Sequence, residues 1–437
     1  MQRYEAYKDS GVEWIGEIPE GWEVVNLSAL ATQRKRKNIG SIEGNVLSLS
    51  YGRIKRRIID NSGLLPESFE TYNVIEPGDI VLRLTDLQND QVSLRVGRSD
   101  ERGIITSAYC TLNPNNVDSR YLFDILACFD YQKGFYGLAG GVRQGLTFDG
   151  IKGLKFPLPS IREQQAIADY LDEKTAEIDS IVSQTERSIE LLREYRKSVI
   201  SEAVTKGLDP DAPMRDSGVE WIGEIPAGWH FDKINRICSI VTDYVASGSF
   251  ADLAENVTYL DSPDYAMLIR TADISGKGSR PKPVFIDKHS YEFLANSNLF
   301  GGELLLPNIG ASVGDIYIVP VLYERMSLAP NSIIFKTKYL DRFYYYFFCS
   351  IFGREMLLGI SGAAAQPKFN KTDFKQLRVV VPPLPEQQVI ADYLDAKTAE
   401  IDSLIADKQR QVELLREYRK SLISEAVTGK FKVPGLE

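Results

Sequence analysis

Cysteine and histidine are scarce in this sequence. Its 437 residues include only four cysteines and two histidines. The cysteines (Cys110, Cys128, Cys238 and Cys349) show none of the short spacings that bind zinc, so we expect neither a metal site nor a disulfide framework. No apolar run is long enough to span a membrane, and the first residues do not form a signal peptide. The expected location is the cytoplasm, without membrane contact.

Enzyme signatures are absent as well. There is no G-x-x-x-x-G-K-[ST] phosphate loop, and GGVRQG at 140–145 has valine where a dinucleotide-binding loop has its middle glycine. The Asn/Asp-Pro-Pro-aromatic motif typical of amino-methylating enzymes does not occur. His230 and His289 alone support neither a catalytic triad nor a zinc hydrolase. We therefore predict a non-catalytic chain that holds no cofactor of its own.

What the sequence does contain is a long stretch that it uses twice. Residues 163–205 return as residues 386–428, with 32 identities in 43 positions. Both copies are rich in strong helix formers and have no proline or glycine inside. An unbroken helix of this length measures about 60 Å, although a kink near 172–175, the least apolar turn, is an alternative.

Each predicted helix carries one apolar seam and has marked ends. Ser160 and Glu163 have the spacing of a capping box, and Gly207 and Gly429 follow the two helices. The seam must be buried against a partner. The simplest partner is the other copy, which predicts an antiparallel coiled coil within the chain; a plain dimerisation coiled coil is the alternative. The seam residues are Ile178, Val182, Ile189, Leu192 and Val199, and then Ile401, Ile405, Val412, Leu415 and Leu422.

A second repeat, DSGVEWIGEIP, occupies residues 9–19 and 216–226 without change. Its tryptophan and the one that follows it suggest an anchor packed against the base of the long helices. The predicted fold class is α+β: two strand-rich domains, separated by two long helices paired as an antiparallel coiled coil, in a pseudo-twofold internal repeat. The predicted boundaries are 1–156 for the first segment and domain, 157–207 for the first long helix, 208–381 for the repeated segment and second domain, and 382–437 for the second helix and tail.

The two strand-rich domains have diverged while the segments around them have not. Apolar, β-branched runs predict strands at 45–54, 79–84 and 104–112, and at 265–274, 302–307, 315–323 and 331–337. Each set is followed by a predicted helix (120–129 and 341–352) and a glycine-rich loop (137–145 and 358–369). One scaffold that carries two unlike surfaces favours a pair of recognition modules.

The net charge of −9 is unevenly distributed. Residues 20–156 and 227–381 carry +1 each, and the remaining segments, linkers and helices carry −11. The cations of the two domains are clustered, as phosphate binding requires, and arginine and glutamine suit the edges of guanine and adenine. A solvated surface is the alternative for each cluster. The candidate contacts to nucleic acid are Arg34, Lys35, Arg36, Lys37, Tyr51, Arg53, Lys55, Arg56, Arg57, Arg143 and Gln144 in the first domain, and Arg270, Lys277, Arg280, Lys282, Gln366 and Lys368 in the second.

Three segments and their repetition resemble a known family. DSGVEWIGEIPEGW, PLPSIREQQAIADYLDEKTAEID and LLREYRKSVISEAVTKG are similar to segments of the specificity (S) subunit of type I restriction–modification systems. The resemblance covers the whole chain. It is strong in the repeated segments and only topological in the two variable domains.

The resemblance implies a division of labour within a larger complex. Each variable domain would be a target recognition domain that reads one half of a bipartite double-stranded DNA site. The helices would set the spacer and dock two methyltransferase (modification) subunits, and restriction (translocase–endonuclease) subunits would complete the assembly. S-adenosylmethionine and ATP would belong to those partners. The alternatives are a bivalent coiled-coil adaptor that binds no DNA and a fused methyltransferase–specificity enzyme, which the missing motifs disfavour.

Overall fold

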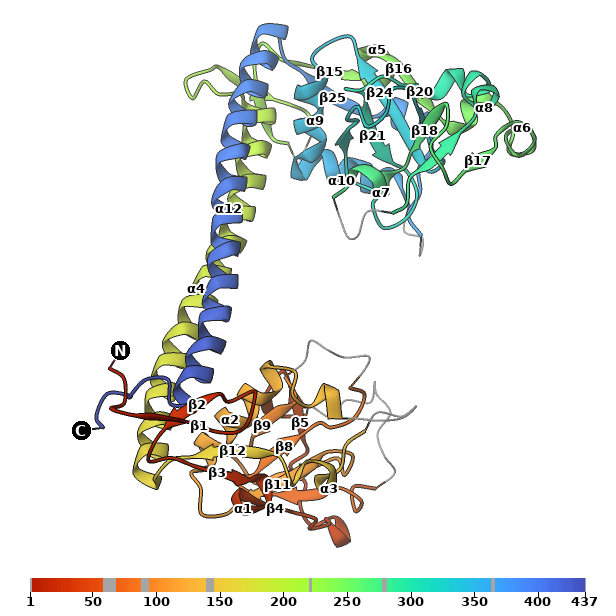
Figure 1. Cartoon of the computed structure of the whole chain (residues 1–437). Coiled ribbons are helices and arrows are strands. Elements are labelled where there is room, and N and C mark those ends of the chain that lie inside the picture. Colours follow the sequence, from red (N-terminus) through yellow and green to blue (C-terminus); the bar gives the residue numbers. More distant parts are fainter. Residues whose placement is uncertain are drawn as a thin grey trace. The chain divides into compact units, whose positions relative to one another are not determined.

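The computed structural model describes residues 2–57, 68–87, 94–138, 145–219, 222–276, 281–362 and 366–436. The chain forms two compact units: residues 1–186 with 409–437, and residues 187–408. Two long helices, α4 (Ile161–Lys206) and α12 (Leu384–Val427), contribute to both. Each unit is therefore built from one strand-rich domain, one repeated segment and part of each long helix (Figure 1).

The first unit contains short strands and a few helices. Its strands are β1 (Tyr7–Asp9), β2 (Glu17–Pro19), β3 (Glu23–Asn26), β4 (Ala31–Gln33), β5 (Leu47–Ser50), β6 (Arg53–Arg56), β7 (Asn73–Ile75), β8 (Ile80–Leu82), β9 (Val96–Arg98), β10 (Gly103–Ile105), β11 (Cys110–Pro114) and β12 (Lys155–Leu158). Its short helices are α1 (Leu27–Leu30), α2 (Ser119–Tyr131) and α3 (Phe148–Ile151).

A four-stranded antiparallel sheet in the order β4-β11-β8-β9 forms the centre of this unit. Helix α2 covers it with an apolar face that includes Tyr121, Ile125 and Leu126, all fully buried. Asp118 caps this helix by accepting hydrogen bonds from the backbone of its first turn. The β5–β6 hairpin and the β7–β10 pair lie beside this sheet, and Val46, just before β5, forms a parallel bridge with Ile104.

The second unit has the same plan with additions. Its strands are β13 (Met214–Asp216), β14 (Glu224–Pro226), β15 (His230–Lys233), β16 (Cys238–Asp243), β17 (Tyr259–Leu260), β18 (Ala266–Ile269), β19 (Val284–Ile286), β20 (Asn298–Leu299), β21 (Leu304–Pro307), β22 (Tyr317–Ile318), β23 (Met326–Leu328), β24 (Ser332–Thr337) and β25 (Arg378–Val381). Its helices are α5 (Ile234–Ile237), α6 (Phe250–Asn256), α7 (Thr271–Ile274), α8 (Lys288–Phe293), α9 (Asp341–Cys349), α10 (Ile351–Ile360) and α11 (Lys371–Gln376).

The sheets of the second unit match those of the first in order. The sheet β16-β24-β21-β22 corresponds to β4-β11-β8-β9, and α9 takes the place of α2. The second sheet, β17-β19-β18-β23-β20, contains a parallel pair, β18 with β23, which corresponds to the parallel bridge beside β5. The segment between β16 and β18 adds α6 and β17, which have no counterpart among the described elements of the first unit.

The predicted seam is buried in both units except at Leu192 and Leu415, which are partly buried. In the first, Ile178 and Val182 of α4 share a core with Val412 and Leu422 of α12. In the second, Ile189 packs with Ile401 and Ile405. Ion pairs show how the two helices run relative to each other. Asp179 pairs with Arg419, and Glu186, further along α4, pairs with Arg416, which comes earlier on α12. The two helices are therefore antiparallel.

The anchor on the helix starts is confirmed for Trp22 and Trp229, whereas Trp14 packs against Phe129 of α2 and Phe156 of β12. Trp22 donates from Nε1 to Oε1 of Glu163 at 3.2 Å, and Trp229 donates to Oε2 of Glu386 at 2.7 Å. Ser160 and Glu163 form the expected capping box. Gly207 has a positive φ of 75° just after α4, a geometry that favours glycine. Trp221 lies outside the described residues.

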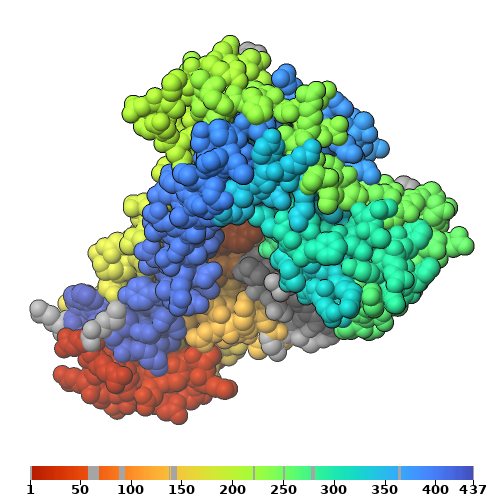
Figure 2. All heavy atoms as spheres, turned by 90° about the horizontal axis from the view of Figure 1, so that it is seen from above, coloured from red at the N-terminus to blue at the C-terminus, as the bar shows by residue number. Residues whose placement is uncertain are grey.

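The two ends of the chain lie together in the first unit. Gln2 bridges Lys432, and Lys430 donates from Nζ to the carbonyl oxygens of Ile15 and Glu17. Figure 2 shows the N-terminal segment against the end of the chain. Gly429, after α12, lies next to Pro19 and Trp22, just as Gly207, after α4, lies next to Pro226 and Trp229 in the second unit.

Several predicted elements differ in their limits. The run 45–54 is a hairpin, not one strand, because Tyr51 and Gly52 turn the chain. The run 104–112 holds two strands, β10 and β11. The run 265–274 ends in helix α7, and the helix predicted at 341–352 is interrupted at Ser350, which caps a second helix, α10. No kink occurs at 172–175, since α4 is continuous.

Candidate nucleic-acid interface

The β5–β6 hairpin carries the densest cation cluster of the first unit. Arg53 and Lys55 alternate along β6 with Ile54, which packs against the small core of Leu47, Ile75, Val81 and Ile105. Because successive strand side chains point to opposite faces, burial of Ile54 turns Arg53 and Lys55 outward. All four cations of the cluster are exposed, namely Arg53, Lys55, Arg56 and Arg57.

Two of these cations are held by carboxylates and two are not. Arg53 lies 3.4 Å from Asp179 of α4, and Arg56 forms a two-pronged ion pair with Glu101, with contacts of 2.6 and 2.9 Å. Lys55 and Arg57 form no side-chain hydrogen bond or ion pair with any described residue. Lys55 and Arg57 are thus available to bind phosphates, whereas Arg53 and Arg56 would have to release a carboxylate in order to bind a phosphate.

The RKRK cluster at 34–37 divides in the same way. Arg34 binds Asp79, which is 1% exposed, at 2.6 Å, and also donates to Oδ1 of Asn113 at 2.6 Å. Arg36 pairs with Glu76, and Lys37 donates to the carbonyl oxygen of Thr71. Lys35 is exposed and has no such partner within the described part of the chain. Arg34 therefore supports the fold, and Lys35 is the better candidate for an external contact.

A groove of about 760 Å³ lies beside the hairpin in the first unit. It runs between the hairpin, α2 and the paired helices. The sequence interpretation missed most of its charges, because they come from elements far apart in the chain. Its cations are Arg53, Lys55, Arg98, Arg120, Arg416, Arg419 and Lys420, and its carboxylates are Asp100, Asp124, Asp172, Asp179 and Glu186.

One of these carboxyls is buried and holds its proton at neutral pH. Burial raises the pKa of Asp124 to about 8, and the charge of Asp172 adds to the rise, while Arg419, Arg98 and Arg120 oppose it. The groove has seven cations against five carboxylates, and protonation of Asp124 adds to this positive excess. This balance favours a polyanion.

The second unit places cations on the connection between β18 and β19. Arg270 follows β18 and Lys282 precedes β19, whereas the first cluster lies on β6 and just after it. Arg270 is held by Asp273 at 2.7 Å and donates to the carbonyl oxygen of Lys282 at 2.7 Å. The predicted contacts Lys277 and Arg280, and Arg143 and Gln144 of the first domain, lie outside the described residues.

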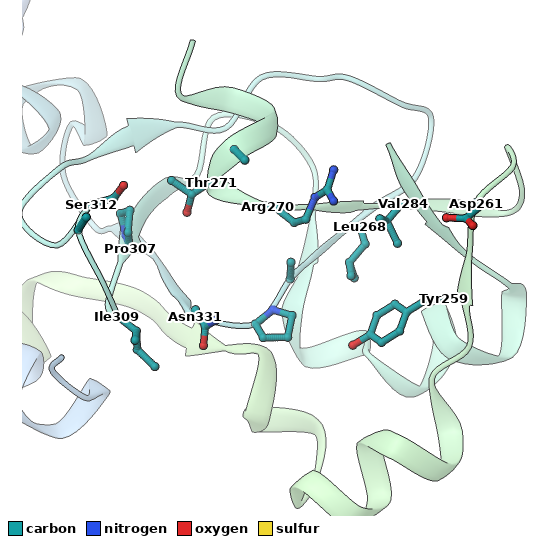
Figure 3. A pocket seen from close by; sticks show the side chains of 14 residues that line it. Tyr259, Asp261, Leu268, Arg270, Thr271, Val284, Pro307, Ile309, Ser312 and Asn331 are labelled. Atoms are coloured by element: carbon teal, nitrogen blue, oxygen red, sulfur yellow. The ribbon is translucent and has the colours of Figure 1, made fainter. Parts of the chain in front are cut away.

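Arg270 also borders a cavity of about 520 Å³ (Figure 3). Tyr259, Leu268 and Val284 supply apolar surface, and Asn331 and Ser312 add polar atoms. Asn331 has a φ of +69°, an uncommon conformation for a residue other than glycine. The sequence offered no signal for this cavity, since Tyr259 belongs to the additional strand β17.

The second glycine-rich loop ends beside the same cavity. Lys368 bridges Ile309, a cavity residue, and Gly310 donates its backbone N–H to the carbonyl oxygen of Pro367. The side chains of Gln366 and Lys368 are exposed. The structure therefore brings Arg270, Gln366 and Lys368, which are far apart in sequence, around one region of the second unit.

Features of a metal site or membrane span are not seen in the described parts of the chain. Among these residues no three His, Cys, Asp or Glu side chains gather as metal ligands, and no helix is long and apolar enough to cross a bilayer. All four cysteines are free, and burial raises the pKa of the Cys110 and Cys128 thiols to about 11. These two thiols are therefore protonated at neutral pH, which makes them poor nucleophiles.

Comparison with known proteins gives a consistent result. Residues 95–191 and 226–414 match the model of the type I restriction modification DNA specificity domain family. The chain is 24% identical to the putative type I restriction enzyme MjaX specificity subunit of Methanocaldococcus jannaschii, over 96% of each chain. It is 21% identical to the type I restriction enzyme EcoKI specificity subunit of Escherichia coli, over 95% of this chain and 90% of that relative.

Solved structures show the same fold. A chain from a structure of complex assembly and conformational transition in the type I R-M system matches 94% of this chain and 98% of its own length, with a TM-score of 0.67 and 15% identity. The HsdS subunit of Thermoanaerobacter tengcongensis matches with a TM-score of 0.51, also at 15% identity and over 94% and 98% of the two chains.

Proposed function

Because the chain belongs to the type I restriction modification DNA specificity domain family, we propose that it selects the DNA sequence on which a type I restriction–modification complex acts. The observation that carries this proposal is the position of the cations. In the first unit a cluster lies on β6, directly after the β5–β6 turn, and in the second Arg270 and Lys282 flank the connection of the matching pair, β18–β19, although the sequences there are unlike. Two domains of one fold that bind different DNA sequences need different side chains at equivalent positions.

Each strand-rich domain then reads one half of a bipartite site. We assign the first half to residues 1–156 and the second to residues 208–381, with the long helices of 157–207 and 382–437 setting the number of unread base pairs between them. Half-sites read from one side of a duplex lie about 34–36 Å apart, one helical turn. Continuous helices of 46 and 44 residues are stiff enough to fix such a spacing.

The long helices also offer two equivalent docking surfaces. In the first unit Leu414 and Tyr418 are 55% and 51% exposed, and in the second Leu191 and Tyr195 are 52% and 49% exposed. Both pairs are spaced i, i+4, so their side chains share one helix face, and they lie 223 positions apart in sequence. Exposed apolar patches mark interaction sites, and two equal patches suit two copies of one partner, which we take to be the methyltransferase subunit.

The remaining partners follow from the same proposal. Translocase–endonuclease subunits would join the complex of specificity and methyltransferase subunits. S-adenosylmethionine and ATP would be bound by these partners and not by this chain. This chain would contribute recognition and geometry, with no catalytic group of its own.

Methylation mapping tests the proposal directly. The chain is co-expressed with its cognate methyltransferase subunit, and the modified bases of the host genome are read by single-molecule sequencing. We expect one bipartite motif with a fixed gap. Absence of any motif, together with DNA affinity that does not change with salt, would instead support the bivalent protein adaptor.

A further inference from the structure

The tip of the β5–β6 hairpin has an unusual residue in a demanding conformation. Ser50 pairs with Arg53, so Tyr51 and Gly52 alone form the turn, and both have positive φ, +47° and +77°. Two positive φ values are the requirement of a type I′ turn, whose first position strongly prefers Asn, Asp or Gly. The positive φ is energetically unfavourable for a tyrosine. The turn itself does not explain why this residue is present.

The packing of the fold does not explain it either. The Tyr51 side chain is 76% exposed, and it makes no hydrogen bond or ring contact with any described residue. The next residue is fixed: a side chain at Gly52 would collide with Leu94. The turn thus packs on Leu94, and ion pairs of Arg53 with Asp179 and of Arg56 with Glu101 hold β6, while the Tyr51 ring is exposed at the edge of the groove.

The surroundings of the ring indicate what it contacts. Lys55 and Arg57, which have no anionic partner among the described residues, follow it on the same hairpin. A two-stranded ribbon fits the major groove of B-form DNA, and cations along it bind phosphates. An aromatic ring delivered to the bases by such a ribbon stacks on them, since every base presents a π face.

We propose that Tyr51 is a stacking residue of the first recognition domain, which places its ring against an unstacked base of the first half-site. This inference rests on the proposed function and extends it, because it predicts a local distortion of the DNA and not only contact with it. Preorganisation of the ring by the rigid turn lowers the cost of insertion. The strained backbone is then retained for DNA binding and not for folding.

The test uses Tyr51→Asn and Tyr51→Phe in the full chain assembled with its methyltransferase subunit. Asn is the preferred residue at this turn position, so Tyr51→Asn should raise the midpoint of thermal unfolding while it weakens binding to a duplex carrying the mapped site by about 5- to 150-fold. Tyr51→Phe keeps the ring and should bind within about threefold of the native chain. Opposite changes in folding and binding cannot come from a misfolded variant.

Base stacking is followed with 2-aminopurine placed at successive positions of the first half-site. We expect one position whose fluorescence rises on binding of the native chain and of Tyr51→Phe, but not of Tyr51→Asn. Equal affinity of native and Tyr51→Asn complexes, or no position with a Tyr51-dependent signal, would overturn the inference. Loss of affinity in Tyr51→Phe as large as in Tyr51→Asn would also overturn it, because the hydroxyl would then be responsible. In each of these outcomes methylation mapping still finds a bipartite motif, whereas no motif is found if the proposed function itself is wrong.

Discussion

Asp124 gives the sharpest prediction about stability. Its pKa is about 8 in the folded chain, against an ordinary value of 3.8. The folded state therefore keeps a proton that the unfolded state releases between these values. It follows that the free energy of unfolding falls as pH rises from about 4 to 8 and levels off above. At 1.36 kcal/mol per pKa unit, the penalty at pH 7 is about 4 kcal/mol.

Replacement by asparagine removes the titration and keeps the shape. Between pH 5 and 7.5 the difference in unfolding free energy, Asp124→Asn minus native, should grow by about 3 kcal/mol in favour of the variant. Urea unfolding followed by tryptophan fluorescence at several pH values measures this difference. The slope with pH is informative even if the new amide changes packing by a constant amount.

The chain supplies its own control for this experiment. Tyr346 occupies in α9 the place that Asp124 occupies in α2. Each lies four residues after an arginine that binds two aspartates of a long helix: Arg120 binds Asp169 and Asp172, and Arg342 binds Asp392 and Asp395. Its hydroxyl has a pKa of about 12, raised chiefly by burial, so Tyr346→Phe should shift stability equally at every pH tested. A pH-independent difference for Asp124→Asn as well would refute the reasoning.

Three further predictions concern the proposed function. Tyr418→Glu and Tyr195→Glu should each remove one methyltransferase subunit from the complex, and the double variant both, as seen by native mass spectrometry; unchanged stoichiometry would place the docking surface elsewhere. Lys55→Ala and Arg57→Ala should each lower the slope of log affinity against log salt concentration by about 0.9 without changing the methylated motif. By contrast, Arg34→Ala leaves the buried Asp79 without its cation and should destabilise the fold by about 3 kcal/mol. A seven-residue insertion at both Thr175 and Thr398 keeps the heptad phase and adds about 10 Å, so it should widen the gap between half-sites and leave both halves readable; a motif with altered bases and the original gap would contradict this.

The sequence by itself determined the frame of this protein. Spacing alone predicted the two helices, their seam and the capping box at Ser160, because these depend on local periodicity and on short-range hydrogen bonds. The anchoring of tryptophan on the helix starts was inferred from the repeat of the tryptophans. The repeat then predicted that one unit would repeat the contacts of the other. It does so in the pairs Trp22–Glu163 and Trp229–Glu386.

The tertiary structure decided what the surface of each domain presents. Arg34 and Lys35 are adjacent and alike in sequence, yet one is bound to the buried Asp79 and the other is exposed. The 45–54 run read as one strand because its apolar alternation continues through Tyr51, whose positive φ no propensity predicts. Likewise the groove beside the hairpin combines α2, α4 and α12, and the cavity at Arg270 combines residues of β17, β18, β19 and β21 with α7 and two loops. Such sites depend on contacts between residues far apart in the chain, which periodicity cannot report.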